Sequence, residues 1–133
     1  MTTELQMLVW VTVLTLVMWL PYILAKLAKD GVLETLNYTT DDNPLPSWAM
    51  RAKKAHYNAI ENFSIFAALI MVAHLANISN DATISAAVAY FWFRLAHYIL
   101  YVSNIPFGRT LAFAGSWFAQ VCIVYQLLVA FPL

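Results

Sequence analysis

Charged residues are scarce in this chain. Only 11% of its 133 residues are Asp, Glu, Lys or Arg, whereas soluble domains average about 25%. Seven basic and seven acidic residues give a formal net charge of zero, so the chain lacks the basic surface that nucleic-acid binding requires. Hydrophobic residues make up 62% of the sequence. This composition argues against a nucleic-acid-binding protein and indicates a membrane protein.

Cysteine is nearly absent, and so are metal-binding patterns. The single cysteine, Cys122, cannot form an intrachain disulfide, and we expect it to pack within a helix. No group of histidine, cysteine and carboxylate residues has the spacing of a metal site, so we predict no bound metal. A cleaved signal peptide is not expected, because Glu4 stands where such peptides carry positive charge.

Long apolar segments, by contrast, dominate the sequence. A membrane-spanning helix needs about 20 mostly apolar residues. Four segments meet this requirement, and we predict helices over residues 5–28, 48–76, 82–102 and 109–131, with a kink at Pro21. Short connections after the second and third helices make neighbouring helices antiparallel. The predicted fold is therefore all-α: a single domain over residues 1–133 that forms an antiparallel four-helix transmembrane bundle, with one long polar loop at 29–47.

Lysine and arginine are distributed unevenly among the predicted loops. The first loop is flanked by Lys26, Lys29, Arg51, Lys53 and Lys54, and Arg109 lies beside the third loop. The second loop and both termini carry no basic residue. Cytoplasmic loops are enriched in basic residues. We therefore expect the first and third loops to face the cytoplasm and both termini to face the opposite side.

Three of the predicted helices carry a polar stripe. At 100° per residue, one face of each helix collects the following side chains: Arg51, Lys54, Asn58 and Glu61; Arg94, His97 and Tyr101; Arg109, Ser116 and Gln120. Charges inside a bilayer are costly, so these stripes should face the bundle interior or a polar cavity. Glu61 and Arg94 both lie roughly 15–20 Å from the same membrane surface.

Two interpretations of these stripes remain open from the residues alone. We predict an ion pair between Glu61 and Arg94, which could do no more than fix the register of the helices. Such a pair does not explain the polar groups nearer the cytoplasmic end, namely Arg51, Lys54, His56, Asn58 and Arg109. Together they form a cationic mouth that suits an anionic ligand.

The same residues carry a resemblance to a known family. The second helix contains R-A-x-x-A-H-x-N-x-x-E-N from Arg51, the third contains F-R-L-A-H-Y-x-x-Y from Phe93, and P-F-G-R-T follows from Pro106. This joint pattern resembles the MAPEG superfamily, the membrane-associated proteins in eicosanoid and glutathione metabolism. The resemblance implies a homotrimer that binds glutathione between neighbouring subunits. The short chain is similar to prokaryotic members, which implies the bacterial inner membrane as its location.

The resemblance also implies roles for individual residues. Arg109 matches the arginine placed near the glutathione sulfur, where a guanidinium favours the thiolate over the thiol. Lys54 matches an arginine that holds a glutathione carboxylate, and Asn58 and Glu61 match contacts to the tripeptide backbone and amine. The other implied glutathione-binding residues are Arg51, His56, Arg94, His97 and Tyr101.

Two residues depart from the family pattern. Tyr57 stands where several members have a second basic residue, and Phe113 stands where some have a tyrosine.

Three functions are compatible with these features: a glutathione-dependent transferase or peroxidase acting on hydrophobic electrophiles, a non-catalytic lipid- or partner-binding membrane protein, and a small transporter or proton channel. The spans lack the inverted repeats of many transporters. The costly polar residues favour the first function over simple lipid binding.

Overall fold

The computed structural model describes residues 1–37 and 44–131, and within these ranges all regular structure is helical. The elements are α1 (Thr3–Val17), α2 (Trp19–Asn37), α3 (Ser47–Leu75), α4 (Asp81–Val102) and α5 (Pro106–Ala130). The predicted all-α class is therefore confirmed. Residues 38–43 of the predicted first loop lie outside the described residues.

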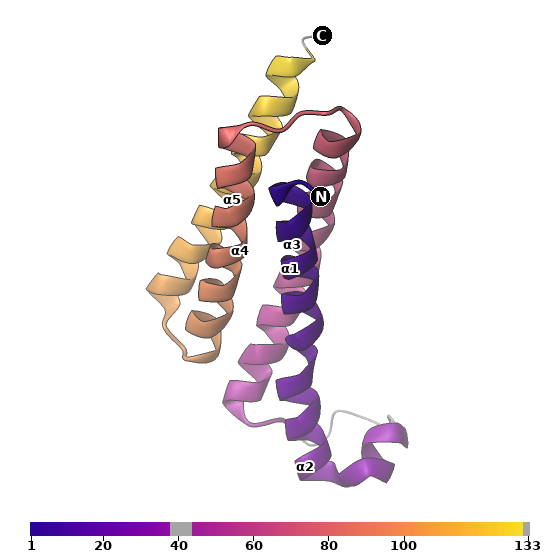
Figure 1. The fold of residues 1–133 in the computed structure, drawn as a ribbon. Helices are drawn as coiled ribbons and strands as arrows, with labels where there is room; N and C mark the ends of the chain where they lie inside the picture. The colour runs from indigo at the N-terminus through magenta and orange to yellow at the C-terminus, as the bar shows by residue number, and fades with distance from the viewer. Residues whose placement is uncertain (38–43, 132–133) are drawn as a thin grey trace.

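The first two elements, α1 and α2, continue one another as a single rod (Figure 1). Met18 separates the two helices, although the backbone of this residue stays in the right-handed helical region at φ −59° and ψ −21°. Pro21 has no N–H to donate to the carbonyl of Val17, four residues earlier. This missing hydrogen bond accounts for the interruption between α1 and α2. Together, α1 and α2 cover 35 residues, from Thr3 to Asn37, and the last part of α2 bends away from the rod.

The prediction of a loop from residue 29 onward is wrong as far as Asn37. Helical structure continues to Asn37, with a sharp bend at Gly31, whose φ of 81° is accessible to glycine at little cost. Beyond the bend, the Thr35 hydroxyl donates to the Gly31 carbonyl and closes a new helical turn. The glycine therefore separates two helical segments that meet at a bend.

Two asparagines shape the short connections of the bundle. Asn77 and Asn104 follow α3 and α4 with φ of 57° and 59°, a left-handed conformation that asparagine tolerates at helix ends. Asn80 then caps α4 through a reciprocal pair of hydrogen bonds with Thr83. Pro106 is the first residue of α5, where its missing N–H costs nothing. These turns make α3, α4 and α5 successively antiparallel.

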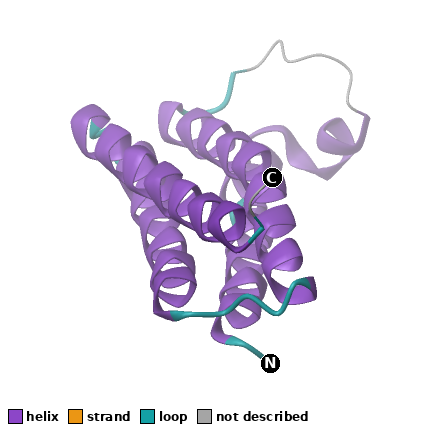
Figure 2. Cartoon of the chain, turned by 90° about the horizontal axis from the view of Figure 1, so that it is seen from above, coloured by secondary structure: helices purple, strands orange, loops and turns teal. Residues whose placement is uncertain are grey.

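The ends of the rods separate into two groups. The N-terminus, the end of α5 and the α3–α4 connection gather toward one end, and the α4–α5 turn and the bent end of α2 lie toward the other (Figure 1). Seen along the rods, the helices lie side by side, and the last part of α2 points away from them (Figure 2). This is the relative arrangement expected from the sequence. Which end faces the cytoplasm stays a prediction.

The core lies where α1, α3, α4 and α5 meet. Phe66 and Tyr90 stack with ring centroids 3.9 Å apart, beside the fully buried Ile123. Near the N-terminus, the buried Glu4 accepts hydrogen bonds from the hydroxyls of Thr83 and Ser79, at 2.6 and 2.9 Å. These contacts hold α1 against the start of α4.

Three helices are long and apolar enough to cross a membrane: Thr3–Asn37, Ser47–Leu75 and Pro106–Ala130. Of the four predicted membrane-spanning segments, three therefore meet the requirement by length and composition. The exception is α4, whose 22 residues include the charged residues Asp81 and Arg94 and the polar His97. Arg94 and His97 are nevertheless buried in the bundle. Two of the groups that lower the hydropathy of α4, Arg94 and His97, thus face the protein interior, whereas Asp81 is exposed at the start of the helix.

Candidate functional site

Arg94 is the most deeply buried charge of the candidate site. Its side chain is 2% exposed, and its guanidinium lies over the rings of Tyr90 and Phe113, at 5.4 and 5.5 Å from their centroids. One terminal nitrogen, Nη1, donates to Oδ1 of Asn58 at 2.8 Å and so joins α4 to α3. Nε and Nη2 have no hydrogen-bond partner among the described residues. Buried polar groups are normally paired, so these two donors are candidate contacts for a polar ligand.

The predicted ion pair between Glu61 and Arg94 is wrong within the protomer. Glu61 is exposed, and its carboxylate makes no hydrogen bond or ion pair with another described residue. The reason is helical geometry: three residues turn the helix through 300°, so Glu61 points about 60° away from Asn58. Asn58, and not Glu61, therefore faces Arg94.

The contact with Arg94 fixes the orientation of the Asn58 amide. A guanidinium has only donors, so the oxygen of the amide must face it. The Asn58 amide nitrogen is then directed elsewhere and can donate two hydrogen bonds to a ligand. Two neighbouring side-chain amides are engaged by the backbone of α3: Asn62 donates to the backbone carbonyl of Asn58 at 2.9 Å, and Gln120 donates to the backbone carbonyl of Asn62 at 3.3 Å.

A series of aromatic contacts links Arg94 to Arg109. His97, which is 4% exposed, packs edge-on against Tyr101 at 5.5 Å and lies 6.2 Å from the Phe113 ring. The Arg109 guanidinium stacks over Tyr101, 4.5 Å from the ring centroid. Contacts of a cation with an aromatic face are attractive and hold the guanidinium in place. α4 and α5 thus bring His97, Tyr101 and Arg109 together near the α4–α5 turn.

Two of the predicted site residues make other contacts. Arg51 donates from Nε to the Val102 carbonyl at 2.9 Å, which satisfies a free carbonyl at the end of α4. His56 is buried, and its Nδ1 is hydrogen-bonded to the Tyr22 hydroxyl at 2.8 Å, which ties α3 to α2. The structure therefore gathers Asn58, Arg94, His97, Tyr101 and Arg109 and directs His56 toward α2.

Lys54 and Glu61 lie exposed on the outer face of α3. Glu61 sits roughly 20 Å along the helix from its start at Ser47, well inside the apolar span. An ionised carboxylate at that depth is costly if it faces lipid. A polar environment on this face of α3 would remove that cost.

Two of the buried contacts, Tyr22–His56 and Glu4–Thr83, were not predicted from the sequence. Tyr22 and His56 are separated by 34 residues and meet only because α2 packs on α3. Glu4 was noted for its charge alone, although a carboxylate at the start of an apolar span signals a buried hydrogen-bonding partner. Phe113, noted as a departure from the family pattern, contacts both Arg94 and His97.

Comparison with models of known protein families finds a match. The model of the MAPEG family matches residues 7–129, which is nearly the whole chain and includes every predicted site residue. Comparisons with curated proteins and with solved structures return no match. The long apolar helices, the buried polar groups between them and the extent of the match lead to one conclusion: the chain is an integral membrane protein that belongs to the MAPEG family.

Proposed function

We propose that this protein is a membrane-bound, glutathione-dependent transferase or peroxidase that acts on lipophilic electrophiles or lipid hydroperoxides. One observation carries the proposal: the buried Arg94, which is hydrogen-bonded to Asn58, is linked through the rings of Phe113, His97 and Tyr101 to the guanidinium of Arg109. Membership of the MAPEG family supports a role in glutathione or eicosanoid metabolism. The linked residues supply hydrogen-bond donors for an anionic peptide and, in Arg109, a cation for a thiolate.

The residues present fit glutathione, which carries two carboxylates, an amine and two amide groups. The Asn58 amide nitrogen can donate to a peptide carbonyl, since its oxygen is engaged by Arg94. Lys54 suits a carboxylate, and Glu61 suits the amine. Both project from the exposed face of α3, so a ligand held by them would lie at the edge of the protomer. This placement supports a site completed by a second copy, as in a homotrimer.

Arg109 has the properties needed to stabilise a thiolate. Its side chain carries a cationic guanidinium, and the ring of Tyr101 holds that guanidinium in a defined position. A cation beside a sulfur in a site of low dielectric constant favours the charged form. When bound, glutathione supplies the nucleophilic sulfur that attacks an electrophile arriving from the bilayer. The protein binds the peptide, orients it and stabilises the negative charge.

A non-catalytic lipid- or partner-binding protein of the same fold is the second candidate. Phe113 favours it, because a phenyl ring packs beside His97 and Arg94 where a tyrosine hydroxyl could have assisted a thiol. Such a protein would have little use for the donors of Asn58 and Arg94. Formation of product from bound glutathione therefore separates the two candidates.

The proposal is tested by calorimetry and a conjugation assay on the purified full-length protein. We expect saturable binding of glutathione and a thioether product when a chromogenic electrophile is added. S-methylglutathione serves as a control ligand, because it keeps the peptide contacts and cannot ionise at sulfur; it should bind without giving product. Binding without product for any electrophile or hydroperoxide would favour the non-catalytic candidate, and absence of binding would contradict the proposal.

A further inference from the structure

The terminal segment of α2, residues 31–37, stands apart from the rest of the bundle. It begins at the bend of Gly31, runs across the direction of the rod (Figure 1) and points away from the other helices (Figure 2). Three of its side chains, Val32, Leu33 and Leu36, are 62%, 77% and 74% exposed. The glutathione proposal gives these apolar side chains no role, and the inference drawn from them is independent of that proposal.

The three apolar side chains share one face of the segment. At 100° per residue, Val32, Leu36 and Leu33 fall within an arc of about 100°, and Glu34 lies on the opposite side. Amphipathic helices lie in the plane of a membrane surface, with the apolar face at the boundary between headgroups and acyl chains. The pattern of the terminal segment therefore suits a lipid surface.

The bend falls at the depth of a membrane surface. Residues 3–30 of the α1–α2 rod are roughly 42 Å long at 1.5 Å per residue. A bilayer with its headgroup regions is about 40–45 Å thick. A straight continuation of the rod to Asn37 would carry the three apolar side chains into water. The bend at Gly31 keeps them at the level of the headgroups.

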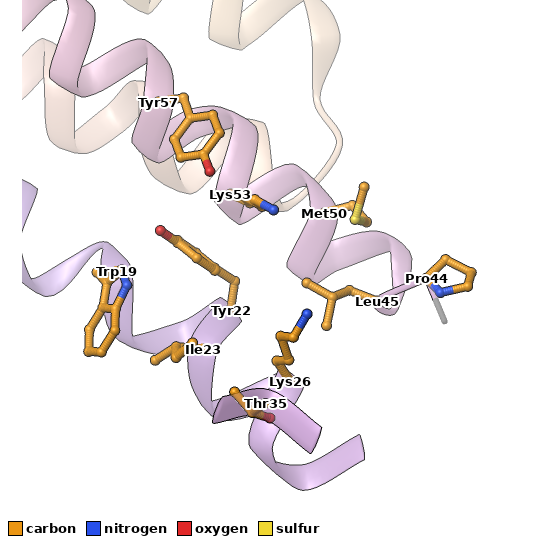
Figure 3. A pocket seen from close by; sticks show the side chains of 10 residues that line it. All are labelled: Trp19, Tyr22, Ile23, Lys26, Thr35, Pro44, Leu45, Met50, Lys53 and Tyr57. Atoms are coloured by element: carbon orange, nitrogen blue, oxygen red, sulfur yellow. The ribbon is translucent and has the colours of Figure 1, made fainter. Parts of the chain in front are cut away.

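A contact on the protein side shows how the segment is turned. Thr35 lines the cavity between α2 and α3 together with Ile23 and Lys26 (Figure 3). Thr35 and Ile23 would be roughly 18 Å apart along a straight helix, because 12 residues separate them. Since both line the same cavity, the terminal segment is folded back beside the span and does not extend from it.

The lipid-facing side of α2 leads directly to the bend. Leu20, Leu24 and Ala28 are exposed and follow one another at four-residue spacing, which places them on one side of the helix. They belong to a helix that is long and apolar enough to cross a membrane, so this side faces acyl chains. Exposed apolar side chains thus continue from the span into the terminal segment. The bilayer is the partner that can cover both.

We propose that residues 31–37 form an interfacial anchor, in which Val32, Leu33 and Leu36 insert among the lipid headgroups and Glu34 faces water. Gly31 sets the angle of the anchor, because its φ of 81° is a conformation that other residues rarely adopt. The anchor holds the end of α2 at a fixed depth and keeps the start of the α2–α3 connection at the membrane surface.

The test is spin-label electron paramagnetic resonance on the full-length protein in phosphatidylcholine–phosphatidylglycerol liposomes, with Cys122→Ala as the background. Labels are attached to Leu33→Cys and Leu36→Cys, and to Glu34→Cys as the matched control on the opposite side of the same turn. Power saturation compares collisions of each label with oxygen, which concentrates in the bilayer, and with a water-soluble nickel chelate. We expect oxygen to dominate at positions 33 and 36 and the chelate to dominate at position 34.

Three results would overturn the proposal. Dominance of the chelate at all three positions would place the segment in water, and dominance of oxygen at all three would show that its two faces are not distinguished. Few collisions with either probe at positions 33 and 36 would show that a protein surface, such as a second copy of the chain, covers them.

A second measurement needs no substitution and applies if a cysteine variant does not fold. The unmodified protein in the same liposomes is photolabelled with a carbene precursor dissolved in the bilayer, and the modified residues are mapped by mass spectrometry. Modification of Val32, Leu33 or Leu36 would support the anchor, and modification confined to the membrane spans would contradict it.

Discussion

Asn58→Asp changes the chemistry of the candidate site at a single atom while keeping its shape. In the wild-type protein the amide oxygen accepts from Arg94 at 2.8 Å, and the amide nitrogen is left as a donor. Aspartate keeps the acceptor that faces Arg94 and replaces the donor with a second acceptor. We therefore expect the fold to be retained, because the buried guanidinium gains a carboxylate partner, and glutathione binding to be weakened.

The size of the effect follows from the hydrogen bond that cannot form. A ligand carbonyl that meets a carboxylate oxygen in place of an N–H is left unpaired, at a cost of about 1–3 kcal/mol. This cost corresponds to a dissociation constant for glutathione that rises about 5- to 150-fold. The assay is calorimetric titration of glutathione, with thermal unfolding in the same detergent as the measure of the fold.

Asn80→Asp provides the control for this prediction. Asn80 caps α4 near the opposite end of the bundle, and aspartate is an equally good cap. Its substitution adds the same charge and should leave the affinity for glutathione unchanged. Wild-type affinity in Asn58→Asp would refute the argument that Arg94 orients this amide as a donor.

Two further predictions concern the packing that positions the site. A Cβ at Gly115 would lie 2.6 Å from the Phe93 ring, so Gly115→Ala should destabilise the α4–α5 pair by about 1–3 kcal/mol, measured by chemical unfolding in detergent; an unchanged unfolding midpoint would show that the phenyl ring moves aside freely. Glu4→Leu removes the acceptor that serves Thr83 and Ser79 and leaves their hydroxyls without it, at a cost of about 1–3 kcal/mol. Because the contacts of Glu4 lie far from Arg109, calorimetry of Glu4→Leu should show unaltered glutathione binding. A large loss of affinity would contradict the prediction that these contacts are independent of the glutathione site.

The helices could be predicted from the sequence because each long apolar run has only one way to satisfy its backbone groups in lipid. α3 occupies Ser47–Leu75, where residues 48–76 were expected. The continuation of α2 to Asn37 was missed, because the bend depends on the conformation of Gly31, and a glycine in a polar segment is equally compatible with a loop.

The candidate site could be predicted less completely. Helical periodicity placed Arg94, His97 and Tyr101 on one face of α4, and the structure shows them joined to Arg109 through ring contacts. Periodicity could not decide which residue of α3 faces Arg94, because Asn58 and Glu61 differ by only 60° on that helix. That choice depends on how α3 and α4 are rotated about their own axes, which packing of the whole bundle determines.

The central claim of this account is that Arg109 stabilises a bound thiolate. A cation that lowers the pKa of the glutathione thiol by about two units contributes roughly 2.7 kcal/mol, enough to turn a minor thiolate population into the major one at neutral pH. The most direct measurement is the ultraviolet absorbance of the thiolate during titration of the purified protein with glutathione. Arg109→Ala and the charge-conserving Arg109→Lys are measured in parallel.

We predict a saturable thiolate signal in the wild-type protein, a partial signal in Arg109→Lys and no signal in Arg109→Ala, while calorimetry still shows binding of the peptide to both variants. A full thiolate signal in Arg109→Ala would contradict the account, and so would wild-type protein that binds glutathione entirely as the thiol.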